Sequence, residues 1–219
     1  MATLQPHAAS TVRLLRFDAV QRWVHWINAI LFTVLIATAI PLYFGSFFGL
    51  VLPRFAVEQV HLWTGIALPG PIIVSMIGPW GRQMRRDVRR VNYWTRQEIA
   101  WMKSLGRTAI TADKFNPGQK LNAIFVAASA LVMFVTGVIL KWFDYFPVTW
   151  RAGSTFVHDF FAWLIVVVIT AHVFMALTHR DALSSMLRGW VSERWAAKNA
   201  AGWLHEEHAV RETSAPPRS

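Results

Sequence analysis

The chain has 219 residues, 54% of them hydrophobic, with 12 Trp and 15 Phe, which is too apolar for an ordinary soluble domain and indicates a single membrane domain over residues 1–219. The absence of cysteine excludes a thiolate-held iron–sulfur cluster, a disulfide and covalently attached haem. The formal charge of +10 comes from Lys and Arg beside apolar segments, where they act as topology signals and contacts for anionic lipid, so we do not expect nucleic-acid binding.

The first two apolar runs predict membrane-spanning helices at about residues 23–44 and 59–78. About 20 apolar residues in a helix cross a hydrocarbon core of roughly 30 Å. The first run lacks the short apolar region and the cleavage site of a signal peptide, so we expect it to remain in the mature protein. In the second run Pro69 and Pro71 flank Gly70, which predicts a kink or a local break.

A strongly basic segment follows at residues 82–115 and is assigned to the cytoplasmic side by the positive-inside rule. Within it, Thr95 precedes Glu98 by three residues, which is the spacing of a helix capping box. We therefore expect a short interfacial helix between Thr95 and Arg107.

The third and fourth spans are predicted at about residues 119–141 and 154–179, joined by a short outer loop. After them, residues 182–219 should form a cytoplasmic helix and tail. The apolar face of that helix would hold Leu183, Met186, Leu187, Trp190 and Val191. The last residues, from about Glu206, look disordered.

Four crossings with both termini in the cytoplasm satisfy this charge distribution. The expected fold class is an all-α integral membrane protein, a bundle of four transmembrane helices with cytoplasmic interfacial helices.

Four histidines lie inside the expected spans, where an ionisable side chain is a functional-site hypothesis by default. His158 and His172 are 14 residues apart, which places them on one helix face about 21 Å apart along the axis. By the expected topology, His172 lies at the cytoplasmic depth of His25. His158 lies at the outer depth of His61. Two facing pairs are what bis-histidine ligation of two haems needs, so we expect the bundle to bind two b haems. The alternative is that each histidine only hydrogen-bonds a neighbouring helix.

Seven segments of the chain carry a recognisable pattern: residues 16–26 (RFDAVQRWVHW), 60–65 (VHLWTG), 93–101 (YWTRQEIAW), 114–122 (KFNPGQKLN), 135–140 (VTGVIL), 157–163 (VHDFFAW) and 171–179 (AHVFMALTH). The four histidines in register and the NPGQK stretch make the combination specific. Together these segments resemble the gamma subunit of respiratory formate dehydrogenases, a di-haem cytochrome b, and the similarity runs from about residue 13 to 204.

The resemblance implies that His25 and His172 hold the iron of the inner haem, and that His61 and His158 hold the iron of the outer haem. It also implies location in the bacterial inner membrane. The implied partners are an iron–sulfur beta subunit and an alpha subunit that contains molybdenum or tungsten.

The resemblance further implies a quinone site, for menaquinone or ubiquinone, beside the inner haem. Its residues match Asn116, Gly118, Gln119 and His172. The chain has Pro117 where the family commonly has Ala, which adds a rigid φ at this turn.

Two functions from different classes remain open on the sequence. The first is an electron-transfer subunit of a formate:quinone oxidoreductase, and related cytochromes of nickel–iron hydrogenases or thiosulfate reductases are alternatives within that class. The second is a metal-ion transporter lined by the four histidines, which would need carboxylates in the membrane, and Asp159 at the outer edge is the one candidate.

Overall fold

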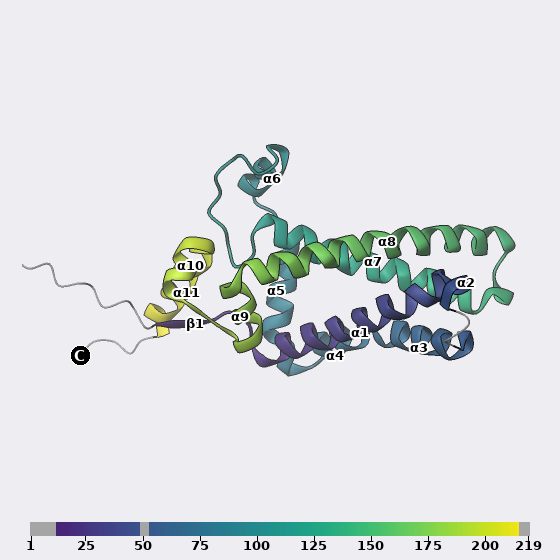
Figure 1. The fold of residues 1–219 in the computed structure, drawn as a ribbon. Helices are drawn as coiled ribbons and strands as arrows, with labels where there is room; N and C mark the ends of the chain where they lie inside the picture. Colours follow the sequence, from purple (N-terminus) through teal and green to yellow (C-terminus); the bar gives the residue numbers. More distant parts are fainter. Residues whose placement is uncertain (1–11, 49–52, 215–219) are drawn as a thin grey trace, which may run out of the picture.

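A computed structural model describes residues 12–48 and 53–214 (Figure 1). Nearly all of this part of the chain is helical. The elements are β1 (Arg13–Leu15), α1 (Ala19–Tyr43), α2 (Gly45–Phe48), α3 (Arg54–Ala67), α4 (Gly70–Ile77), the 3₁₀ turn η1 (Pro79–Gly81), α5 (Arg82–Asn92), α6 (Arg96–Lys103), α7 (Pro117–Lys141), the 3₁₀ turn η2 (Phe143–Tyr145), α8 (Val148–Thr178), α9 (Arg180–Arg188), β2 (Trp190–Ser192), α10 (Glu193–Asn199) and α11 (Ala201–Ser214).

Four helical segments of the described chain are long and apolar enough to cross a membrane: α1, α3 together with α4, α7, and α8. They run in alternating directions, with α1 packed along α3 and α7 packed along α8 (Figure 1). The expected all-α integral membrane fold with four spanning helices is confirmed.

The two ends of the bundle differ in character. One end carries α5, α6, α9, α10 and α11 and most of the Lys and Arg, and we call it the basic end (Figure 1). The opposite end, which we call the far end, carries α2, η2 and the first turns of α3 and α8. Most side chains of the spans are exposed or half-buried, because in a four-helix bundle one face of each helix meets lipid.

Capping boxes fix the start of α1, α6 and α7. At α6 the Thr95 side chain accepts from the Glu98 N–H, and the Glu98 carboxylate accepts from the Thr95 N–H, as the sequence predicts. At α1 the same reciprocal bonds join Asp18 and Gln21. The cap starts α1 at Ala19, four residues before the expected position, so its first turn lies outside the apolar run.

Two further boundaries differ from expectation at the far end. α3 begins at Arg54 rather than near residue 59, and its first turns contain an ion pair between Arg54 and Glu58 at 2.8 Å. α8 begins at Val148, so the second half of the expected loop belongs to this helix. Apolar length predicts where a helix can cross lipid, whereas the helix itself continues into the interface.

The second span is interrupted where Pro69 and Gly70 predict it. α3 ends at Ala67 and α4 begins at Gly70, with Leu68 and Pro69 between them. Leu68 is buried, and its N–H donates to the Thr64 carbonyl, so the break is closed by local bonds and by packing.

The segment after α8 does not form the single surface helix expected. α9 ends because Gly189 takes a φ of 91°, in the left-handed region that favours glycine. Trp190 and Val191 therefore leave the helix and enter β2. This strand pairs antiparallel with β1, with Leu14 opposite Val191.

The expected disorder from Glu206 onward does not hold for residues up to Ser214, which belong to α11; residues 215–219 lie outside the described part. α11 is fixed by packing and by charge. Nη2 of Arg90 donates hydrogen bonds to Oε1 and Oε2 of Glu206, at 2.7 and 2.6 Å. The buried apolar cluster at this end consists of Leu14, Val191, Ala196, Ala200, Trp203 and Leu204.

A buried ion pair joins α5 to the loop before α7. The Lys114 ammonium donates to Asp87 at 2.5 Å, and the Gln21 amide donates to the same carboxylate oxygen. The Lys114 side chain is 0% exposed and that of Asp87 is 6% exposed. Burial raises the pKa of Asp87 against the opposing charge of Lys114, and burial lowers the pKa of Lys114. Each charge is thus tolerated here because of the other.

We expect Asp87→Asn to destabilise the protein by about 3–5 kcal/mol, because it leaves the Lys114 cation buried without a counter-ion. Adding Lys114→Met should restore most of the loss. The measurement is the melting temperature of the protein in detergent. Arg54→Ala is the control, since it removes an ion pair whose side chains are 65% and 45% exposed, and it should cost at most about 1 kcal/mol. Equal melting temperatures of Asp87→Asn and Arg54→Ala would contradict this account.

Candidate cofactor-binding site

The histidines of α1 and α8 meet in the half of the bundle nearer the basic end. The ring centres of His25 and His172 are 6.2 Å apart, and their planes are inclined by 57°. Trp26 packs edge-on against His25, with 5.2 Å between ring centres. The structure thus brings together the pair expected at the inner depth.

The histidines of α3 and α8 form a second pair nearer the far end. The ring centres of His61 and His158 are 6.4 Å apart, at 61°. Here each Nδ1 lies 2.8 Å from a threonine hydroxyl, Thr38 on α1 for His61 and Thr136 on α7 for His158. All four spanning segments contribute to this second pair.

The spacing of both pairs fits two imidazoles on opposite sides of one metal ion. A metal–imidazole nitrogen bond is about 2.0–2.1 Å, and the ring centre lies roughly 1.1 Å beyond the nitrogen, so two ligands in line have centres about 6.3 Å apart. The observed 6.2 and 6.4 Å lie on either side of that value. Such a pair could hold an iron whose other four ligands come from a porphyrin.

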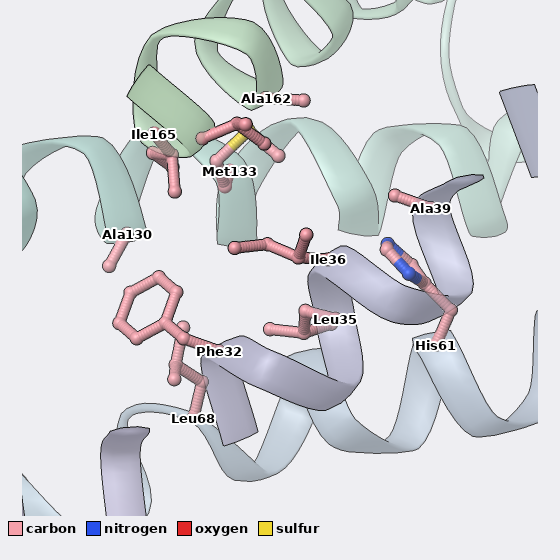
Figure 2. Close-up of a pocket in the computed structure, with 11 residues that line it drawn as sticks. Phe32, Leu35, Ile36, Ala39, His61, Leu68, Ala130, Met133, Ala162 and Ile165 are labelled. Carbon is pink, nitrogen blue, oxygen red and sulfur yellow. The ribbon is translucent and has the colours of Figure 1, made fainter. Parts of the chain in front are cut away.

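An apolar cavity lies inside the bundle beside His61 (Figure 2). Its lining residues on α8 lie between His158 and His172 along the helix. Its volume is about 60 Å³, it is partly open to the surroundings, and His61 lies at one edge. Side chains from all four spans converge on it, which suits the apolar edge of a macrocycle. The lining residues are Phe32, Leu35, Ile36, Ala39, His61, Leu68, Ala130, Met133, Ala162, Ile165 and Val166.

The turn that begins α7 holds the other candidate residues. Asn116 and Gln119 cap the helix reciprocally, each side-chain oxygen accepting from the other's backbone N–H at 2.9 and 3.1 Å. With the oxygens engaged, the two side-chain amide NH₂ groups remain as donors, and Asn116, Gly118 and Gln119 are exposed. Pro117 is buried at the first helical position, where no N–H is needed.

This turn lies at the basic end, as does the His25–His172 pair. Within residues 12–48 and 53–214, however, no hydrogen bond or ring contact joins the side chains of the turn to His172. The structure brings the four histidines together as two pairs. It places the turn and His172 on two helices, α7 and α8, that pack against each other.

Sequence reasoning missed how firmly the turn is held. Lys114 and Lys120, on either side of it, are both buried and paired, Lys114 with Asp87 and Lys120 with Glu98 at 2.6 Å. Phe115 packs against a neighbouring ring of the N-terminal segment. The sequence signal is the symmetric placement of two lysines around NPGQ, which charge counting alone assigns to solvent.

It also missed Thr38 and Thr136, since threonines are common in membrane helices and their spacing from the histidines is not local. Only the packing of α1 on α3 and of α7 on α8 brings the hydroxyls to the rings.

Comparison with curated proteins gives relatives along nearly the whole chain. The cytochrome b556(fdo) subunit of formate dehydrogenase from Escherichia coli K12 is 26% identical over 217 residues, covering 92% of this chain and 97% of that protein. The formate dehydrogenase cytochrome b556 subunit of Haemophilus influenzae is 25% identical, covering 91% and 85%. The nitrate-inducible cytochrome b556(Fdn) subunit of E. coli is 26% identical, covering 88% and 91%.

The family comparison covers most of the chain as well. A family model described as prokaryotic cytochrome b561 matches residues 16–189, a range that includes both histidine pairs and the α7 turn. Proteins of this family are membrane-integral helical bundles that bind haem, in agreement with the fold and with the donor set of the two pairs. The chain therefore belongs to the prokaryotic cytochrome b561 family.

Proposed function

We propose that this chain is the di-haem cytochrome b subunit of a respiratory formate dehydrogenase, which anchors the complex and conducts electrons from an iron–sulfur partner to quinone. The inner iron is held by His25 and His172, and the outer iron by His61 and His158. When bound, the two haems supply one-electron carriers at two depths. The protein supplies axial ligands, an apolar surrounding and a quinone-binding surface.

The observation that carries this proposal is that two histidines of α8 each face a histidine of another span at metal-bridging distance. His158 and His172 are separated by about 21 Å along α8. Each faces one histidine from a different span, at 6.4 and 6.2 Å between ring centres. A single pair would support one cofactor, whereas two pairs in line provide a path across the membrane.

The proposed orientation places the basic end, and with it both termini, on the cytoplasmic side of a bacterial inner membrane, since Lys and Arg are retained there. Electrons then move inward, toward the His25–His172 pair. With the inside negative, one electron moving inward across 100 mV costs about 2.3 kcal/mol. A low-potential donor at the far end has to supply this free energy.

The donor within this class is proposed from the relatives, which are named as formate dehydrogenase subunits. A formate dehydrogenase implies an iron–sulfur beta subunit and an alpha subunit with molybdenum or tungsten. Hydrogenase and thiosulfate reductase cytochromes are the other candidates.

A tag on this chain in its native host should therefore co-purify an iron–sulfur subunit and a molybdenum- or tungsten-containing subunit, and the complex should reduce quinone with formate. The control is the same purification from a strain with an untagged chain. Recovery of a nickel-containing partner with hydrogen-dependent activity would contradict formate as the donor while keeping the cytochrome assignment.

The metal-ion transporter is less well supported by the site. A path for a hydrated cation needs polar groups in succession, and carboxylates are common among its ligands. The cavity is lined by apolar side chains apart from His61. The same imidazole pairs in an apolar space suit a macrocycle.

For the quinone, we propose a surface formed by Asn116, Gly118, Gln119 and His172. A quinone carbonyl accepts hydrogen bonds, and the cap leaves the amide NH₂ groups of Asn116 and Gln119 as donors. Gly118 allows close approach, and a Cβ there would meet only the Asn116 side chain, at 3.4 Å. The buried pairs of Lys114 and Lys120 hold the turn in place before the quinone binds.

The ligand assignment predicts that each haem depends on its own pair. His61→Ala or His158→Ala should remove mainly the outer haem, and His25→Ala mainly the inner one, because loss of an axial ligand exposes one face of the iron. Haem per protein is measured from absorbance of the purified chain. His179→Ala is the control, since this ring lies at the end of α8 and bonds the Met175 carbonyl. Two haems retained in every variant would refute the assignment.

The quinone assignment is tested with Asn116→Asp and Gln119→Glu. Both keep the side-chain oxygen that caps α7 and remove the amide donor, so helix stability should change little. Quinone reduction by the assembled complex should fall about tenfold for each hydrogen bond lost, at about 1.4 kcal/mol, while both haems remain reducible by the donor. Asp18→Asn is the matched control, because it changes a cap of the same type at α1. Unchanged quinone kinetics in both test variants would place the site elsewhere.

A further inference from the structure

In the described part of the chain, each histidine of the outer pair lies next to a threonine hydroxyl, and the histidines of the inner pair do not. Thr38 Oγ1 lies 2.8 Å from His61 Nδ1, between α1 and α3. Thr136 Oγ1 lies 2.8 Å from His158 Nδ1, between α7 and α8. The same residue type thus meets the same ring atom at the same distance in two helix pairs that are far apart in sequence.

The direction of these hydrogen bonds follows from a second contact of each hydroxyl. Thr38 Oγ1 is also 2.8 Å from the Val34 carbonyl, and Thr136 Oγ1 is 2.8 Å from the Val132 carbonyl. A carbonyl oxygen only accepts, and a hydroxyl has one proton. If the hydroxyl proton pointed to the ring, two oxygen acceptors would face each other at 2.8 Å. The hydroxyl therefore donates to the carbonyl and accepts from the ring, which puts the ring proton on Nδ1.

We propose that Thr38 and Thr136 are positioning residues for the outer iron, which fix the Nδ1–H tautomer of His61 and His158 and keep each Nε2 free to bind the metal. This inference rests on the proposed function. Partners on the non-ligating nitrogen of a metal-bound imidazole orient the ring and raise its basicity. Here the carbonyl bond polarises the hydroxyl further, which makes it a better acceptor.

The inner pair lacks this arrangement. Among the described residues, the rings of His25 and His172 have no hydrogen bond to a protein group, and His25 packs against Trp26 instead. More basic ligands favour ferric over ferrous iron, so the outer site should have the lower potential. Transfer from the outer to the inner site is then downhill, and this difference offsets part of the cost of moving charge inward.

The variants follow from the geometry. Thr136→Val keeps the shape and removes the acceptor, and Thr136→Ser restores the hydroxyl. Thr136 is the first single site, because its hydroxyl lies 2.8 Å from Nδ1 of His158. Thr38→Val with Thr136→Val removes both hydroxyls. Thr33→Val is the control, because this exposed threonine of α1 bonds the Ala29 carbonyl at 2.8 Å and no ring.

The experiment is a spectroscopic redox titration of the purified complex, with haem per protein measured in parallel. We expect Thr136→Val to raise the potential of the transition that His61→Ala removes, by about 59 mV for each tenfold loss of ferric over ferrous preference. The double variant should shift further, and the other transition should stay in place. Thr136→Ser and Thr33→Val should resemble the wild type. Selective loss of the outer haem in Thr136→Val, with the haem retained in Thr136→Ser, would also support the inference. Hydrogen-bond partners of a metal-bound imidazole contribute about 10–100-fold to metal affinity.

Unchanged potentials with full haem content in the double variant would overturn the inference, as would equal shifts of both transitions or failure of serine to restore the wild-type values. A wild-type protein without b-type absorbance would instead overturn the proposed function. The two failures are therefore distinguishable.

Discussion

The placement of two histidines on one long helix constrains the rest of the bundle. His158 and His172 lie on one face of α8 at two depths, so their partners must come from helices that enter the membrane from opposite ends. α1 and α3 do so, and each carries its histidine within about two turns of its start. Because the spans alternate in direction, His25 lies at the depth of His172 and His61 at the depth of His158. The packing of α1 on α3 and of α7 on α8 sets the distances between the rings.

Several polar groups in this apolar bundle hold a histidine ring or a turn in place. The hydroxyls of Thr38 and Thr136 orient rings, while the pairs of Lys114 with Asp87 and Lys120 with Glu98 hold the turn before α7. Each such group is costly to bury alone and acceptable when paired. These pairings hold the histidine rings and the turn before α7 in fixed positions without a bound ligand, as a preorganised site requires.

The sequence predicts the four spans, the break at Pro69, the α6 cap and the depth pairing of the histidines, because apolar length, proline chemistry and helical periodicity are local properties. It does not predict β2, which depends on pairing with β1 near the N-terminus. Nor does it predict that residues 206–214 form a helix, which depends on the contact of Arg90 with Glu206. The threonine–histidine bonds were missed for the same reason. They arise from which helices become neighbours, and a spacing along one chain does not contain that information.

We propose that this chain holds two b-type haems between its four spans. The most direct measurement is the haem-to-protein ratio of the purified full chain, combined with its reduced-minus-oxidised spectrum. Two facing imidazole pairs predict a ratio of two, with b-type bands in a single low-spin set, because every iron has two nitrogen axial ligands. A ratio of one, or a colourless protein, would contradict the account.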